Sequence, residues 1–219
     1  MRALVHPKTL RSSIPAALGS AVLALPRIIL WPDRSYPVWY LETVLFLSGI
    51  VLWSFVFAWH GLFTGQPIFT LRIRRRHAVE ATVAGLLCAA LLHFFIDPRL
   101  RSIIPDEYPS SVLQLVAMAL FSLGFGQLFT IFAPFAWSLR LFRDGRLAAV
   151  LTVLFGVALM ITKKHSGPVA LPAFLLVSLM ILTIASVSLS IYWLLRGGIL
   201  LVWWFTLLAF SRHLIQLFG

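Results

Sequence analysis

The stretch RGGILLVWWFTLLAFSRH, from Arg196 to His213, decides the fold class of this chain. It is entered through two glycines, and between Gly198 and Phe210 its polar side-chain atoms are two indole nitrogens and the hydroxyl of Thr206. Such a run suits a bilayer interior, where about 20 apolar residues cross a hydrocarbon core of about 30 Å. The stretch therefore predicts a membrane helix, and it raises the question of which residue on it performs any chemistry.

The composition of the whole chain supports the same class. Of the 219 residues, 60% are hydrophobic and 11% are charged, whereas soluble domains are typically about 25% charged. The mean hydropathy is +0.95. A chain of this length holds about six to eight spans and leaves no room for a sizeable soluble domain. We predict an all-α fold, a polytopic transmembrane helical bundle of about six to seven spans that forms one integral membrane domain, residues 1–219.

Apolar runs divide the chain into three parts. Residues 1–35 form a basic head and a weak first span that is interrupted by Pro15 and Pro26. Residues 36–110 hold spans two and three, and residues 111–219 hold the remaining runs. In chain order the apolar runs lie at about 13–31, 37–63, 78–96, 112–137, 147–162, 169–195 and 198–210. Whether the first of these crosses the membrane or lies in its interface stays open.

The net charge of +11 comes from 18 Lys and Arg against seven acids. In a soluble protein this excess would suggest nucleic acid, but here the basic residues lie between spans, where they orient the chain and meet anionic lipid headgroups. We expect membrane lipids and a protein partner in the membrane, no nucleic acid and no soluble small-molecule substrate. The protein is predicted to lie in the bacterial inner membrane.

The distribution of basic residues predicts the orientation. Cytoplasmic loops carry an excess of Lys and Arg, which places the basic N-terminus, the arginines of loop 72–76, the turn 140–146 and Arg196 in the cytoplasm. The acidic loop 97–109 then faces outward. Lys163 and Lys164 are an exception to this bias, because the topology places these two lysines on the outer side together with the acidic loop.

Ionisable residues at membrane depth are the first candidates for chemistry, because a charge there is costly. Glu42 and Glu80 are the two carboxylates within the apolar runs. We expect Glu80 to pair with the nearby arginines at headgroup level and Glu42 to extend toward water. His60 and His93, near span ends, are candidates for binding a haem, a pigment or a metal ion across two spans, with interfacial hydrogen bonding as the alternative. No single helix shows converging imidazoles or carboxylates, so we predict no metal site and no cofactor.

The second half of the chain, roughly Phe121 to His213, resembles a known family. The segments FGQLFTIFAPFAWSLRLFRDGRLAAVLTVLFGVALM and LLRGGILLVWWFTLLAFS are similar in rhythm to the catalytic helices of the CPBP family, the CAAX protease and bacteriocin-processing membrane endopeptidases. In that family one helix carries Glu-Glu-x-x-x-Arg and the next carries Phe-x-x-x-His. After one more span, a last helix carries His-x-x-x-Asn. The resemblance implies a helical core spanning 111–219.

The catalytic residues of that family are missing here. Its paired glutamates fall on Gly126 and Gln127, its first histidine on Leu159, and its last histidine and asparagine on Leu207 and Ser211. A glutamate that activates water is a general base, a role that these residues do not fill. The resemblance therefore implies a degenerate, non-catalytic member.

Two classes of function follow. The first is a non-catalytic membrane protein that acts as a subunit, scaffold or accessory factor, with close helix approach at small residues; these are Gly124, Gly126, Ser186, Ser188 and Ser190. The second is an active intramembrane endopeptidase that uses non-standard residues, Glu80 or Glu42 with His60 or His93. A haem- or pigment-binding subunit is the third hypothesis.

Overall fold

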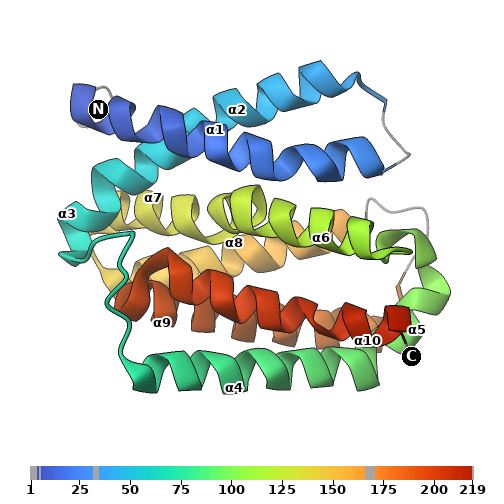
Figure 1. Ribbon diagram of the computed structural model, residues 1–219. Helices are drawn as coiled ribbons and strands as arrows, with labels where there is room; N and C mark the ends of the chain where they lie inside the picture. The colour runs from blue at the N-terminus through green and yellow to red at the C-terminus, as the bar shows by residue number, and fades with distance from the viewer. Residues whose placement is uncertain (1–3, 5, 32–34, 166–170, 219) are drawn as a thin grey trace. The chain divides into compact units, whose positions relative to one another are not determined.

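The computed structural model describes residues 4, 6–31, 35–165 and 171–218, with the backbone alone at 164 and 165. Within these ranges the regular structure is helical and contains no strand. Six helices of the described part are long and apolar enough to cross a membrane. The predicted all-α, polytopic bundle is confirmed (Figure 1).

The helices follow one another with short connections. In chain order they are α1 (Pro7–Leu30), α2 (Val38–Phe55), η1 (Val56–His60), α3 (Gly61–Thr64), α4 (Arg75–Leu91), η2 (Leu92–Ile96), α5 (Asp97–Ile103), η3 (Pro105–Glu107), α6 (Val112–Phe121), η4 (Ser122–Gly126), η5 (Leu128–Phe132), α7 (Ala133–Phe142), α8 (Gly145–His165), α9 (Ala173–Phe210) and α10 (Arg212–Phe218). Four of the short elements, η1, η2, η4 and η5, are single π-helical turns inside longer helices.

The chain forms two compact units, each built from two separate stretches. The first contains Met1–Ile68 and Ser111–Ala148, and the second contains Phe69–Ser110 and Ala149–Gly219. The edge between residues 110 and 111 coincides with a predicted boundary, whereas the edges after residues 68 and 148 were not predicted.

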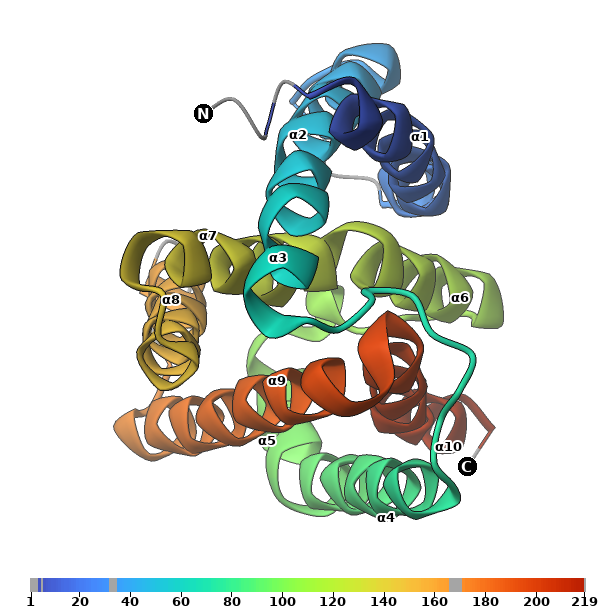
Figure 2. The same ribbon diagram turned by 90° about the vertical axis from the view of Figure 1, so that its left-hand side faces the viewer.

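In the first unit α1 lies against α2, as Figure 2 shows. The 24-residue α1 is a full helix despite its internal prolines, so the segment predicted as a weak span is long enough to cross. Two side-chain hydrogen bonds join the pair, because Trp53 Nε1 donates to Ser20 Oγ at 2.9 Å and Ser54 Oγ donates to Ser13 Oγ at 3.1 Å. These bonds satisfy polar groups where lipid offers none.

Small residues permit close helix contacts, but only some of the predicted ones do so. A Cβ placed at Gly124 would lie 2.7 Å from Leu23 Cβ, so this glycine sets the distance between η4 and α1. A Cβ at Gly126 would meet only atoms of its own turn, none nearer than 3.6 Å. In the second unit Ser188 is exposed. Gly126 and Ser188 therefore make no close contact with another helix among the described residues, and a contact with a partner helix at these positions stays a prediction.

In the second unit α9 turns back on itself at Gly198, whose φ of 65° and ψ of −165° are not helical. The rings of Trp193 and Phe205 lie 4.8 Å apart, although twelve residues of straight helix would separate them by about 18 Å. The start of α9 reaches α5, where Arg99 lies over the ring of Phe174 at 4.6 Å. Arg212, two residues after the end of α9, donates to Asp97 of the same α5 at 2.9 Å. The two arms of α9 thus correspond to the last two predicted apolar runs.

The second arm of α9 packs along α4. A Cβ at Gly85 would lie 2.8 Å from Leu208 Cβ and 3.1 Å from the carbonyl oxygen of Phe205. Trp204 Nε1 donates to Thr82 Oγ1 at 2.8 Å in the same contact. Close backbone approach and a hydrogen bond between helices are the usual means of association in a membrane.

Candidate functional site

The most deeply buried carboxylate of the second unit is that of Asp97. It lies directly after the π-helical turn η2, at the first residue of α5, and it is 2% exposed. A charge this buried needs hydrogen-bonding partners.

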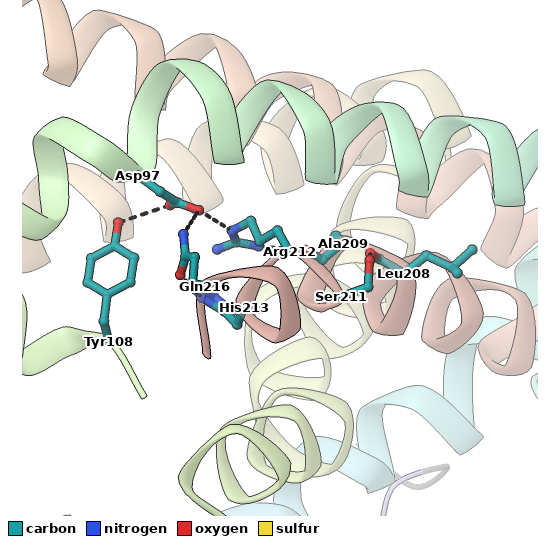
Figure 3. A network of polar contacts seen from close by, with 8 residues as sticks. All are labelled: Asp97, Tyr108, Leu208, Ala209, Ser211, Arg212, His213 and Gln216. Carbon is teal, nitrogen blue, oxygen red and sulfur yellow. Dashed lines mark hydrogen bonds and ion pairs between the residues drawn. The ribbon is translucent and has the colours of Figure 1, made fainter. Parts of the chain in front are cut away.

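Three donors from two other segments meet this carboxylate (Figure 3). Tyr108 Oη donates to Oδ1 at 2.9 Å. Arg212 Nε and Gln216 Nε2 both donate to Oδ2, each at 2.9 Å. The last two residues are four positions apart on α10 and therefore share one face of it. Asp97 thus ties α10 and the loop before α6 to the end of the third span.

A second group of contacts surrounds these bonds. His213 Nδ1 and Gln216 Oε1 are 2.9 Å apart, and the rings of Tyr108 and His213 meet edge to face with centroids 5.7 Å apart. Arg212 Nη1 also donates to the carbonyl oxygen of Ala209 at 2.7 Å. The acid and the imidazole are therefore linked through the amide of Gln216.

Tyr108 lies outside the spans, and its pKa is raised, first by burial of the phenol and then by the negative charge of Asp97. Both effects favour the neutral phenol. Tyr108 therefore remains a hydrogen-bond donor to Asp97 throughout the physiological pH range.

None of these residues was predicted as part of a site. Asp97 was interpreted as part of an acidic loop, and the C-terminal polar residues were not grouped. One signal was present in the sequence, because Arg212 and Gln216 have helical spacing directly after an apolar run.

A second polar cluster lies at the start of α4. Glu80 Oε1 accepts from Arg76 Nε at 2.7 Å, while Glu80 Oε2 lies 3.2 Å from His77 Nδ1 and accepts from Tyr192 Oη at 3.4 Å. The predicted pairing of Glu80 with the arginines is confirmed. The expectation that no helix pairs an imidazole with a carboxylate was wrong, because His77 and Glu80 form such a pair at i, i+3.

The two clusters of the second unit mark its two ends. Along one helix Glu80 and Asp97 are about 25 Å apart, which is close to the thickness of the hydrocarbon core. At the Asp97 end, Lys163 Nζ lies 3.5 Å from Glu107 Oε2. The predicted topology places Lys163 on the outer side, against the usual distribution of basic residues. In the structure this lysine lies beside an acid at the Asp97 end of the unit.

The other predicted site residues do not pair within their units. His60 is 1% exposed in the first unit, and neither ring nitrogen has a hydrogen-bond partner among the described residues. Glu42, in the same unit, has a buried Oε2 without a partner there. In the second unit His93 has an unpartnered Nδ1 and lies about 20 Å from Glu80 along the helix. The two acid–imidazole pairs that could form within one unit, Glu42 with His60 and Glu80 with His93, therefore do not form.

Ligand binding by His60 or His93 stays a prediction. His60 is enclosed by protein, with the ring of Phe135 at 6.3 Å between centroids, so a tetrapyrrole would require packed side chains to move. Among the described residues no group of three His, Cys, Asp or Glu has the arrangement of a metal site.

His60→Leu is expected to raise thermal stability. A buried polar group without a partner is destabilising by about 1–3 kcal/mol, and leucine restores apolar packing of similar size. Thermal unfolding of the detergent-solubilised protein measures the effect against the wild-type chain. A fall in unfolding temperature for His60→Leu would indicate that the imidazole has a stabilising ligand.

The positions of the resembled family's catalytic residues are spread over both units. Gly126 and Gln127 lie at the π-helical turns η4 and η5 of the first unit. In the second unit Leu159 is half-buried, Leu207 is 41% exposed and Ser211 donates to the carbonyl oxygen of Leu208 at 2.6 Å.

No protein-family model, curated protein or solved structure matches this chain. The fold itself defines the class: an all-α, polytopic integral membrane protein. In its second unit the buried and half-buried carboxylates lie at the ends of the spans rather than midway along them.

Proposed function

We propose that this chain is a non-catalytic integral membrane protein, a subunit, scaffold or accessory factor of a membrane complex. In this proposal it is a degenerate relative of the CPBP endopeptidases in the bacterial inner membrane, with its basic N-terminus in the cytoplasm. The observation that carries the proposal is the carboxylate of Asp97, whose two oxygens are both engaged by donors from other segments.

Catalysis by a carboxylate requires an oxygen within hydrogen-bond reach of the proton that it removes. At Asp97 three donors occupy the carboxylate, and at Glu80 an arginine, a histidine and a tyrosine do so. Such groups are suited to holding helices together. The resembled family's positions add support, because Gly126, Gln127 and Leu159 supply no acid or base.

Apolar side chains on the helix surfaces support a role in contact. On α2, Leu47 and Val51 are 56% and 53% exposed, and on α8, Val150 and Leu154 are 54% and 57% exposed. Each pair is four residues apart and forms a stripe along one helix face. Such stripes suit lipid acyl chains or the apolar face of a partner helix.

Gentle extraction tests the proposal. The affinity-tagged protein is purified from its own membrane in mild detergent, and co-eluting proteins are quantified by mass spectrometry. We expect a partner in constant ratio with the chain, and the same ratio for the variants Glu80→Gln and Glu42→Gln, because neither change removes a contact surface.

A different result of this purification would indicate an enzyme. A chain that elutes alone and hydrolyses membrane peptides, with hydrolysis lost in Glu80→Gln or Glu42→Gln, would show an enzyme instead. An absorption spectrum of the same preparation tests for a bound haem or pigment at His60 or His93.

A further inference from the structure

The approach to α4 carries arginines that the described chain leaves without acidic partners. Arg72, Arg74 and Arg75 are exposed, and within the described residues no ion pair involves their guanidinium groups. Arg74 is the N-cap of α4 and provides no side-chain cap to the helix. Three cations therefore lie together beside a helix start, which itself carries partial positive charge.

The nearest carboxylate does not neutralise this group. Glu80 is already bound by Arg76 and His77. Its third donor is Tyr192. The guanidinium of Arg196 lies 3.6 Å from the centre of the Tyr192 ring, so a further cation lies near this cluster. Figure 1 shows the start of α4 at the same end of the second unit as the turn of α9. This end is therefore strongly basic.

The opposite end of the second unit is different. There Arg212 is paired with Asp97 and Lys163 with Glu107. Arg99 and Arg101 are also exposed at that end, but three acids, Asp97, Asp106 and Glu107, lie there as well. At the start of α4 the four arginines at 72 and 74–76 lie beside one acid, Glu80. The excess of positive charge is thus larger at the α4 end of the unit.

Exposed apolar side chains lie among the same arginines. Phe69 is 47% exposed and Leu71 is 90% exposed, directly before Arg72. A segment that combines cations with large apolar side chains lies in the boundary between headgroups and acyl chains. Arginine also matches phosphate oxygens with two parallel hydrogen bonds.

From these observations we propose that Phe69–Arg76, together with Arg196, forms a binding surface for the phosphate groups of anionic phospholipids. The arginines contact the headgroups while Phe69 and Leu71 enter the acyl region. This inference is independent of whether the protein has a partner subunit or an enzymatic activity.

The test compares two variants that remove equal charge. Arg74→Gln/Arg75→Gln changes the proposed surface, and Arg99→Gln/Arg101→Gln changes exposed arginines at the opposite end. The detergent-solubilised full chain is titrated with short-chain phosphatidylglycerol and, separately, with phosphatidylcholine, and binding is followed by native mass spectrometry. Thermal unfolding confirms that each variant is folded.

We expect the wild-type chain to prefer phosphatidylglycerol. The Kd for this lipid should rise about 30-fold in Arg74→Gln/Arg75→Gln, which is about 2 kcal/mol at 1.4 kcal/mol per factor of ten, and should stay unchanged in the other variant. Equal losses in both variants, or no loss in either, would overturn the proposal.

Two further measurements test whether binding depends on charge and whether the site is specific for a lipid rather than for free phosphate. Binding of phosphatidylglycerol to the wild-type chain should weaken as salt is added, and insensitivity to salt would contradict a charged surface even if the variants fail to fold. Inorganic phosphate should not displace the lipid at equal concentration. Displacement would show a site for free phosphate and would overturn the lipid assignment.

Discussion

Asp97→Ala is expected to lower the free energy of unfolding by about 3–5 kcal/mol, because it leaves a charged arginine without its partner in a buried position. The side chains of Arg212 and Asp97 are 16% and 3% exposed, and their atoms lie 2.9 Å apart. The same substitution also removes the acceptor for Tyr108 and Gln216. Thermal and denaturant unfolding in detergent micelles measure the loss.

The matched control breaks an ion pair at the same end of the unit. Glu107→Ala removes the partner of Lys163, but these side chains are 41% and 69% exposed. An exposed pair contributes about 0–1 kcal/mol, so the expected loss is much smaller. Similar losses for Asp97→Ala and Glu107→Ala would contradict the structural role assigned to the buried network.

Gly198→Ala is expected to lower the free energy of unfolding by about 1–3 kcal/mol and to disturb the turn of α9. The combination of φ 65° and ψ −165° belongs to a region that is essentially restricted to glycine. The measurements are thermal unfolding and proteolytic cleavage within α9.

Gly65 provides the control for this prediction. Its φ of 67° is similar, but its ψ of 6° places it in the left-handed helical region, which asparagine also adopts. Gly65→Asn should therefore leave stability nearly unchanged. A Gly198→Ala variant as stable as wild type would show that α9 does not require the turn described here.

Local patterns predicted much of this fold. Apolar runs are long and uninterrupted enough to predict the spans, and the two-glycine sequence separated the last two runs where the turn of α9 lies. The pairing of Glu80 was predictable because Arg76 lies four residues before it, within one turn of helix.

The Asp97 network was not predictable in the same way. Asp97 and Arg212 are 115 positions apart in the sequence, and their contact depends on α9 turning back and on η2 shifting the helix face. A π-helical turn moves hydrogen bonds by one residue and leaves no clear pattern of residue types. The sequence likewise indicates several small residues without showing which of them lie in close contact, as Gly124 does.

We propose that the carboxylates of this bundle hold helices together and break no bonds. This proposal is tested by mapping new peptide N-termini by mass spectrometry in cells that express the wild-type chain, the Asp97→Asn/Arg212→Gln variant or no protein. This variant removes both charges and retains side chains that form hydrogen bonds. We expect the same set of N-termini in all three. Cleavage products that require the wild-type chain and disappear in the folded variant would contradict it.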